Sequence, residues 1–359
     1  MEDFKGKKVC FVLSNLGVGG TERVVVTLAE YFYNKNIEVS IINLFRKEKF
    51  FKLPPGIKIF EPVLERRGMN RFIYAIRLMP YLRRNLKKLN PSVIVSHGEW
   101  FNSYVILSTR FLPYKIFVAD HLHPDLKFGL LLDLAKKILY KRAKGVIVNT
   151  YYAAAIIKKR TGTNKVFVLP NPINLINRKD CRIKNSIITV GRLSPEKGQK
   201  FLIEAFARLN LKDWYLNIVG DGPDRAELEK LSVKLGVNEK VIFHGYKREF
   251  DDLLSESKLF VLPSLSENFP LALCEAMSVP LACISTDCTA GKGSDTIIEN
   301  GKNGIIVKSG DVDELAKAID LLISDEVIRT RLANEAYKIR VKLDKEKIIN
   351  DYLNVILNT

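Results

Sequence analysis

The sequence predicts an α/β protein of two doubly wound domains, each built on a parallel sheet. The chain has 359 residues, more than one hydrophobic core usually supports, so two domains are expected. Short continuous apolar runs alternate with helix-like stretches in both halves, as is typical of parallel strands covered on both faces. Residues 170–185 are rich in Asn, Pro and charge and predict a linker. We therefore expect domains over 1–178 and 182–343.

The first half begins with a strand. The run Val9-Cys-Phe-Val-Leu13 is too short for the core of a signal peptide and ends in Ser14-Asn15, so it predicts a buried strand. Further apolar runs follow, separated by stretches in which apolar residues recur at helical spacing. Strands are expected at 9–13, 39–44, 93–96, 116–119, 146–149 and 166–169, and helices at 22–34, 71–89 and 130–141.

The alternation restarts after the linker. Strands are expected at 187–190, 215–219, 241–243, 259–262, 281–284 and 305–307, and helices at 201–209 and 345–357, the last with Asp344 placed to cap it. Ligands of such sheets bind beyond the carboxyl ends of the strands. The loops that follow the strands are therefore the candidates for a functional site.

Charge is concentrated in the first half. Residues 1–180 hold 32 basic and 13 acidic side chains, a net charge of +19, whereas the remainder carries −2. This asymmetry predicts an anionic partner surface for the first domain, either nucleic acid or an acidic membrane. The stretch 66–88 has eight basic residues, no acid and an apolar stripe at helical spacing that includes Phe72 and Ile76. This stretch and a second basic-apolar helix at 127–144 fit anionic lipid.

Two glutamates eight positions apart, Glu267 and Glu275, follow the apolar run at 259–262. Pro270 between them marks a helix start, where its missing N–H costs nothing. Free N–H groups at such a terminus attract phosphate. One carboxylate outside the terminus and one a turn inside it would bracket a nucleotide diphosphate sugar; ordinary surface glutamates are the alternative.

Two glycine-containing loops add to this pattern. In Gly191-Arg-Leu-Ser-Pro-Glu-Lys-Gly198, Arg192 can bind phosphate through two parallel hydrogen bonds and Lys197 adds a mobile charge. A solvated charged loop is the alternative. Gly17-Val-Gly-Gly-Thr21 could bring its backbone close to a phosphate or an acceptor, but Glu22 in the third glycine position excludes a dinucleotide fingerprint.

In this order the motifs resemble those of the retaining glycosyltransferases of family four, which have the GT-B fold. The resemblance also covers Gly19-Gly-Thr-Glu-Arg-Val24, Pro170-Asn-Pro-Ile173, Gly220-Asp-Gly-Pro223 and the stretches 241–245 and 300–307. It implies an α/β GT-B architecture of two facing Rossmann-like domains, the first for the acceptor and the second for the donor. It also implies that a C-terminal helix, 344–359, crosses back onto the first domain.

The resemblance implies roles for individual residues. Glu275 would accept from ribose hydroxyls and Glu267 from the transferred sugar, while Arg192 and Lys197 would neutralise the diphosphate. His121 would donate to the donor sugar, with Asp120 orienting it. The expected catalytic residues are His121, Glu267, Arg192 and Lys197. The donor-binding residues include the last three of these and also Gly19, Gly20, Gly220, Lys247, Asn268, Phe269, Pro270, Leu271 and Glu275. On the acceptor side we expect Gly17, Thr21, His97 and Asp120.

The resemblance implies that the anomeric configuration of the transferred sugar is retained. As a hypothesis we adopt a front-face path, in which the leaving phosphate helps to deprotonate the acceptor hydroxyl. No metal or cofactor is expected, since Arg and Lys neutralise the diphosphate, and Asp311-Val-Asp313 predicts a helix cap. Three departures from the family pattern bear on sugar specificity: Asn268 replaces a usual glycine, 280–283 lacks the usual Gly-x-Pro-Val, and 286–293 lacks a proline.

The sequence therefore predicts a hexosyltransferase of cell-envelope polysaccharide or glycolipid synthesis. Its donor would be a nucleotide diphosphate sugar, with UDP as the expected nucleotide and a hexose or N-acetylhexosamine as the transferred group. Its acceptor would be a lipid-linked oligosaccharide, lipopolysaccharide or capsule precursor. The protein would be cytoplasmic and peripheral on the inner face of the membrane, because no apolar run is long enough to span it and five cysteines lack a Cys-x-x-Cys pair.

Two alternatives remain open at this point. The first is another nucleotide-sugar enzyme on the same fold, such as an epimerase or an inverting transferase, since fold does not fix function. The second is a nucleic-acid-binding protein, which the net charge of +17 suggests. Against the second, no recognisable nucleic-acid-binding motif is present, and no nucleic acid partner is expected.

Overall fold

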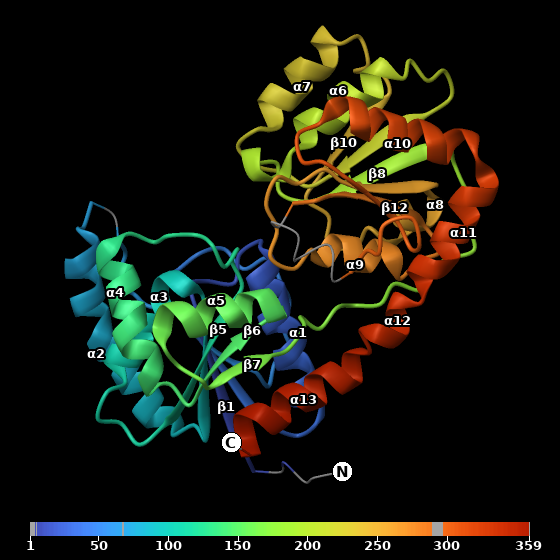
Figure 1. Cartoon of the computed structure of the whole chain (residues 1–359). Helices are drawn as coiled ribbons and strands as arrows, with labels where there is room; N and C mark the ends of the chain where they lie inside the picture. The colour runs from blue at the N-terminus through green and yellow to red at the C-terminus, as the bar shows by residue number, and fades with distance from the viewer. Residues whose placement is uncertain (1–3, 5, 67, 289–296, 359) are drawn as a thin grey trace. The chain divides into compact units, whose positions relative to one another are not determined.

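The computed structural model describes residues 4, 6–66, 68–288 and 297–358, which fold as two compact units (Figure 1). Unit 1 comprises Met1–Pro172 and Lys345–Thr359, and unit 2 comprises Ile173–Asp344. Residues 289–293, which belong to the stretch that lacks the proline usual in the family, lie outside the described residues. Each unit is an α/β layer structure on a parallel sheet, as the apolar runs predict.

Unit 1 has a seven-stranded parallel sheet in the order β3-β2-β1-β4-β5-β6-β7. The chain builds outward from β1 to one edge and from β4 to the other, so the strand order reverses between these two strands. The last helix, α13, belongs to this unit and contacts β4. The elements are β1 Lys8–Leu13, α1 Gly20–Asn34, β2 Glu38–Asn43, β3 Lys58–Phe60, α2 Arg71–Leu89, β4 Val93–His97, α3 Glu99–Ser108, β5 Lys115–Asp120, α4 Leu130–Leu139, a 3-10 turn Tyr140–Arg142, β6 Gly145–Val148, α5 Tyr151–Thr161, β7 Val166–Val168 and α13 Lys345–Asn358.

Unit 2 has a six-stranded parallel sheet in the order β10-β9-β8-β11-β12-β13, and its order reverses between β8 and β11. The elements are β8 Ser186–Val190, a 3-10 turn Pro195–Lys197, α6 Gln199–Arg208, β9 Tyr215–Val219, α7 Arg225–Lys234, β10 Val241–Gly245, α8 Asp251–Glu256, β11 Leu259–Leu262, α9 Leu271–Met277, β12 Ala282–Thr286, β13 Ile305–Val307, α10 Val312–Ser324, α11 Glu326–Tyr337 and α12 Ile339–Lys342.

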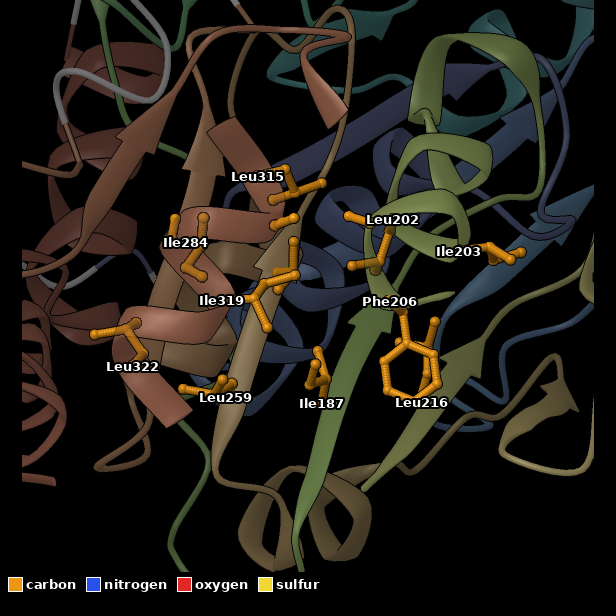
Figure 2. Packing of buried hydrophobic residues seen from close by; sticks show 14 of the residues in the cluster. Ile187, Leu202, Ile203, Phe206, Leu216, Leu259, Ile284, Leu315, Ile319 and Leu322 are labelled. Atoms are coloured by element: carbon orange, nitrogen blue, oxygen red, sulfur yellow. The ribbon is translucent and has the colours of Figure 1, made fainter. Parts of the chain in front are cut away.

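The core of unit 2 forms where two helices cover the sheet (Figure 2). Leu202 and Phe206 of α6 lie against Ile187 and Leu216 of the strands, and α10 adds Ile319. These side chains are buried almost completely, and burying each one stabilises the fold by about 1.5–3 kcal/mol. The packed sheet is thus a rigid support for the loops at its carboxyl edge.

The segment 169–185 contains neither helix nor strand, in agreement with its linker composition. Its second part is nevertheless attached to unit 2. The N–H of Ile176 donates to Ser278 Oγ at 2.9 Å, and the N–H of Lys184 donates to Glu256 O at 2.7 Å. The backbone from Ile173 onward therefore folds with the second sheet.

The α2 helix has apolar residues on both a buried and an exposed face. Leu82 and Leu86 are buried, whereas Phe72 is 56% exposed and Ile76 is 70% exposed. The buried face in the first half of the helix is instead Tyr74 and Leu78. The apolar residues at helical spacing are therefore divided between the core and a second, outward-facing edge.

The structure confirms one capping prediction and defines several elements that the sequence did not predict. Asp311 precedes α10, and its side chain accepts the Glu314 N–H at 2.9 Å, so it caps this helix. The elements that were not predicted include β3, α3, α5, α7 and α11. In the described part of the chain, no helix combines the length and the apolar character that crossing a bilayer requires.

Candidate active site

Four of the predicted binding segments follow or end the strands at which each sheet reverses its order. In unit 1, β1 leads into the Gly17–Thr21 loop and β4 ends at His97. In unit 2, β8 leads into Gly191–Gly198 and β11 leads into Pro263–Pro270. Ligands of open parallel sheets bind at this carboxyl edge, in the crevice at the reversal point. Topology therefore selects the same loops as the sequence motifs do.

The loops of unit 2 are joined by an ion pair between Lys197 and Glu267. The Nζ of Lys197 lies 2.6 Å from Oε1 of Glu267, and Ser264 Oγ donates to the same oxygen at 2.8 Å. The Leu265 N–H also donates to the Glu196 carbonyl at 2.8 Å. The pair is partly shielded, with Lys197 26% and Glu267 11% exposed. It places a cation and a hydroxyl-accepting carboxylate side by side at the carboxyl edge.

Gly220 allows a third loop, after β9, to approach the first. Its φ is +139°, and a Cβ there would lie 1.8 Å from the Gly191 carbonyl oxygen. Gly198 allows the same close approach to the loop after β11: its φ is +65°, and a Cβ would lie 2.1 Å from the Pro263 carbonyl oxygen. The three loops thus pack backbone against backbone, which only glycine permits at these positions.

The second glutamate lies in the interior of unit 2. Glu275 is in α9 and is 1% exposed, while Asn268 and Phe269 in the preceding loop are also buried. Asn268 is not among the described residues with a positive φ, so the turn does not require the usual glycine. Pro270 directly precedes the helix and Leu271 begins it, while Arg192 and Lys247 are exposed on other loops. The assignment of Glu275 to ribose stays a prediction.

In unit 1 the glycine loop leads into the N-terminus of α1. Asn15 Oδ1 accepts the Gly17 N–H at 2.8 Å, and Gly19 precedes the first helical residue, Gly20, with Thr21 next in the turn. Burial raises the pKa of Glu22 in the same turn. The loop is held in a defined shape at the end of a helix of 15 residues. Its contact with donor or acceptor stays a prediction.

His121 and His97, which follow and end neighbouring strands, contact each other. His97 Nδ1 lies 2.8 Å from His121 Nε2, and the rings stack at 5.1 Å between centroids with an interplanar angle of 12°. Asn149 Nδ2 lies 3.5 Å from His121 Nδ1. Burial lowers the pKa of His121 to about 4 and that of His97 well below its usual value, so both are neutral at pH 7. One N–H therefore donates to the other ring.

Asp120 takes part in a separate buried cluster. Its Oδ1 accepts from Tyr140 Oη at 2.7 Å and from Asn102 Nδ2 at 3.0 Å, and its Oδ2 lies 2.5 Å from Lys136 Nζ. Sequence reasoning missed this cluster, because α3 was not predicted and Lys136 was read as part of a basic surface helix. That interpretation of Lys136 is wrong: the side chain is buried because Asp120 neutralises it.

Comparisons with known proteins identify the family. The family described as Glycosyltransferase Family 4 matches residues 18–176, and the family described as Glycosyl transferases group 1 matches residues 177–339. The chain is 24% identical to an uncharacterised glycosyltransferase of Haemophilus influenzae over 98% of this chain and 100% of that protein.

Two further similarities concern a named enzyme and a solved structure. A Campylobacter jejuni α-1,4-N-acetyl-D-galactosaminyltransferase, named for a PP-undecaprenol-linked glycan, is 26% identical over 97% of this chain and 98% of its own. Anabaena HepE, solved in complex with UDP, is 19% identical, with a TM-score of 0.80 over 97% of this chain and 98% of that chain. The HepE likeness establishes the fold. From the matches to both halves, the chain belongs to the family 4 glycosyltransferases of the GT-B fold.

Proposed function

We propose that this glycosyltransferase transfers a hexose or N-acetylhexosamine from a UDP-sugar to a membrane-held glycan, with retention of configuration. The observation that carries the donor assignment is the Lys197–Glu267 pair at the carboxyl edge of unit 2. A diphosphate sugar presents anionic oxygens next to hydroxyl donors, and this pair offers a cation next to a carboxylate. The complex of HepE with UDP supports the choice of nucleotide.

The proposed reaction uses the donor diphosphate both as leaving group and as base. The bond between the anomeric carbon and the phosphate oxygen breaks, and the acceptor oxygen bonds to that carbon on the same face. The acceptor proton passes to the leaving phosphate. Arg192 and Lys197 stabilise the charge that develops on the diphosphate, and Glu267 holds sugar hydroxyls. Neutral His121 accepts from His97 at Nε2 and donates to the transferred sugar from its Nδ1–H.

The acceptor assignment rests on the surface of unit 1. Along α2, Phe72 and Ile76 project outward beside basic side chains, and Ile76 and Arg84 help to line a groove of about 550 Å³. On α4, Leu130 is 85% exposed. Exposed apolar side chains interleaved with Lys and Arg favour binding at the surface of an anionic membrane, at about 1 kcal/mol per basic residue. The name of the Campylobacter jejuni relative, which contains undecaprenol, supports a lipid-linked acceptor.

Radiolabelled nucleotide sugars, each incubated with the protein and a lipid extract, test this function. We expect label from a UDP-sugar to enter the organic phase. A Lys197→Met variant should lose most of this transfer, and a Lys200→Met variant, which removes a nearby exposed charge, should keep it. Release of a free epimerised sugar nucleotide, with no label in lipid or glycan, would contradict the proposal.

Vesicle sedimentation at rising salt tests the acceptor side separately. Binding to acidic vesicles should weaken steeply, because salt screens surface charges within about 8 Å at physiological ionic strength. The double variant Phe72→Ser and Ile76→Ser should bind less. The control variant Val233→Ser and Val327→Ser, at exposed positions of unit 2, should bind as the parent does. Equal binding to neutral and acidic vesicles, or tight duplex DNA binding without vesicle binding, would contradict the membrane assignment.

A further inference from the structure

A cluster of three charged side chains lies buried in unit 1 next to His121. Glu99, the first residue of α3, is 8% exposed; Asp120 at the end of β5 is 5% exposed; and Lys136 of α4 is 8% exposed. Charged residues are seldom buried to this extent unless they are paired, because removing them from water is costly. The three residues come from three different elements. They therefore link α3, β5 and α4 at one point.

The cluster fixes the chain on both sides of His121. On one side, Glu99 Oε1 accepts the backbone N–H of Leu122 at 2.5 Å. On the other side, the Asp120 carboxylate accepts from Tyr140 Oη at 2.7 Å and pairs with Lys136 Nζ at 2.5 Å. Hydrogen bonds with an ionised partner are shorter and about twice as strong as neutral ones. The residue before His121 and the residue after it are thus each anchored to a helix.

The cluster is too enclosed to bind a substrate itself. The cavity beside it, lined by Glu99, Asp120, Lys136 and the apolar side chains of Phe128 and Ile157 among others, has a volume of about 10 Å³. That volume is about one water-sized sphere, which is too small for a sugar ring or a phosphate group. Glu99 can therefore influence the reaction only through the loop that it holds.

The cluster has one more acid than base. Burial and then the charge of Asp120 raise the pKa of Glu99 to about 7, and Lys136 acts against this shift. The titratable groups around Glu99 come from β4, the end of β5 and the loop after it, α4 and the turn after α4; they are His97, Asp120, His121, His123, Lys136 and Tyr140. From α5, Ala153 and Ile157 add only apolar surface to the cavity.

We propose that Glu99 is a positioning residue for His121. Glu99 is the first residue of α3, and the positive charge of Lys136 offsets part of the negative charge of the cluster. The Glu99 carboxylate accepts the Leu122 N–H and so sets the orientation of the His121 ring. The ring is then stacked on His97 with its nitrogens directed to His97 and Asn149. The consequence for catalysis rests on the proposed function, because the contact of His121 with the donor sugar belongs to that proposal.

Glu99→Ala, Glu99→Gln and His121→Ala test the inference, with Glu346→Ala, an exposed glutamate of α13, as control. NMR of labelled histidines in the unliganded protein reads the His121 environment without reference to activity. Glu99→Ala should shift the His121 and His97 ring signals and lower kcat by roughly 10- to 100-fold, with little change in KM, as expected for a displacement of about 1 Å. Glu99→Gln keeps an oxygen acceptor for Leu122 and should restore the ring signals and most of kcat.

The pH dependence of stability gives a second readout. A folded-state pKa raised from 4.5 to about 7 means that the stability contributed by Glu99 is present below pH 4.5 and is lost as the pH rises through about 7. The melting temperature of Glu99→Gln relative to the parent should therefore increase across this interval, and that of Glu346→Ala should not. This readout also applies if Glu99→Ala does not fold.

The outcomes separate this inference from the proposed function. Unchanged His121 signals in Glu99→Ala, or equal losses of kcat in Glu99→Ala and Glu99→Gln, would overturn the positioning role. Shifted ring signals in Glu99→Ala together with full activity of His121→Ala would keep the structural link and overturn the catalytic use of His121. A flat stability difference for Glu99→Gln from pH 4.5 to 8 would contradict the burial of Glu99 beside the Asp120 carboxylate.

Discussion

The ammonium of Lys197 lies 2.6 Å from the carboxylate of Glu267, although 70 residues separate them in sequence. The two residues follow β8 and β11, the neighbouring strands at which the sheet reverses its order. Without a donor, each charge neutralises the other. A bound diphosphate would compete with Glu267 for the Lys197 ammonium, and sugar hydroxyls would then take the place of Lys197 at the Glu267 carboxylate. With the roles proposed for these two residues, the pair would couple binding of the diphosphate to binding of the sugar.

Glu267→Gln should separate these two contributions. The variant leaves the Lys197 charge without its carboxylate, so affinity for UDP should stay or rise. The additional affinity of a UDP-sugar over UDP should fall by about 10- to 100-fold, since hydrogen bonds to a charged group contribute about 1.5–3 kcal/mol each. Calorimetric titration with both ligands measures the difference. Equal weakening of UDP and UDP-sugar would show that Glu267 does not contact the sugar.

Arg192→Ala and Lys197→Ala should weaken UDP more than uridine. The reason is that both cations are assigned to the diphosphate and not to the base. Lys200→Ala is the matched control, because Lys200 is an exposed lysine at the start of α6. The measurement is the ratio of the UDP and uridine dissociation constants in each variant. An unchanged ratio would assign the two side chains a structural role.

Glu275→Gln tests the ribose assignment at a buried position. The amide keeps the shape of the side chain and removes its charge, so we expect weaker UDP binding and lost turnover in a folded protein. The wild type should prefer UDP to 2′-deoxy-UDP, and the variant should lose this preference. The measurement is the ratio of the two dissociation constants by calorimetry. The same ratio in both proteins would exclude a contact with the 2′-hydroxyl.

Gly220→Ala should destabilise unit 2 and weaken UDP binding. The added Cβ would lie 1.8 Å from the Gly191 carbonyl oxygen, and the backbone at residue 220 has a φ of +139°, which alanine rarely adopts. The loops after β8 and β9 must therefore separate. Such backbone strain alone costs about 1–3 kcal/mol. Gly236→Ala is the control, because Gly236 has a φ of +69° and no atom within 4 Å of the added Cβ. Equal melting temperatures of the two variants would contradict the close packing of these loops.

Much of this fold follows from the sequence, because the sheets are buried on both faces. Runs such as Val9–Leu13 and Leu259–Leu262 are uniformly apolar, and in parallel sheets that pattern has few other interpretations. The helices α3 and α5 are harder to predict. They bury polar residues such as Asn102, Ser103 and Thr161, so their apolar periodicity is weak. Polar burial depends on partners that only the tertiary structure supplies.

Dependence on tertiary partners also limits how much of the candidate site the sequence can predict. The glycine, arginine and glutamate motifs mark loops that follow parallel strands, since each loop carries its own local pattern. The contacts between loops do not follow from local patterns. The Lys197–Glu267 pair, the His97–His121 stack and the Lys136–Asp120 pair each join residues of different elements. Lys136 illustrates the difficulty, because a buried lysine and a solvated one look alike in a basic helix.

Acid pH should destabilise unit 1 through His97 and His121. Burial depresses the pKa of both rings, for His121 from 6.5 to about 4, so the unfolded state takes up protons first. Their contribution to stability is present above pH 6.5 and is lost as the pH falls toward 4, by roughly 3 kcal/mol for His121. Urea unfolding of His121→Asn and the parent over this range measures the difference. A pH-independent difference would contradict the neutral state of the two histidines.

The anomeric configuration of the product distinguishes retention from inversion. NMR of the isolated product, after transfer from an α-linked UDP-sugar to the lipid-linked acceptor, reads the coupling of the anomeric proton. We predict an α-linked product, because the acceptor attacks from the face that the diphosphate leaves. A β-linked product would contradict the retaining mechanism and the roles assigned to Arg192, Lys197 and Glu267.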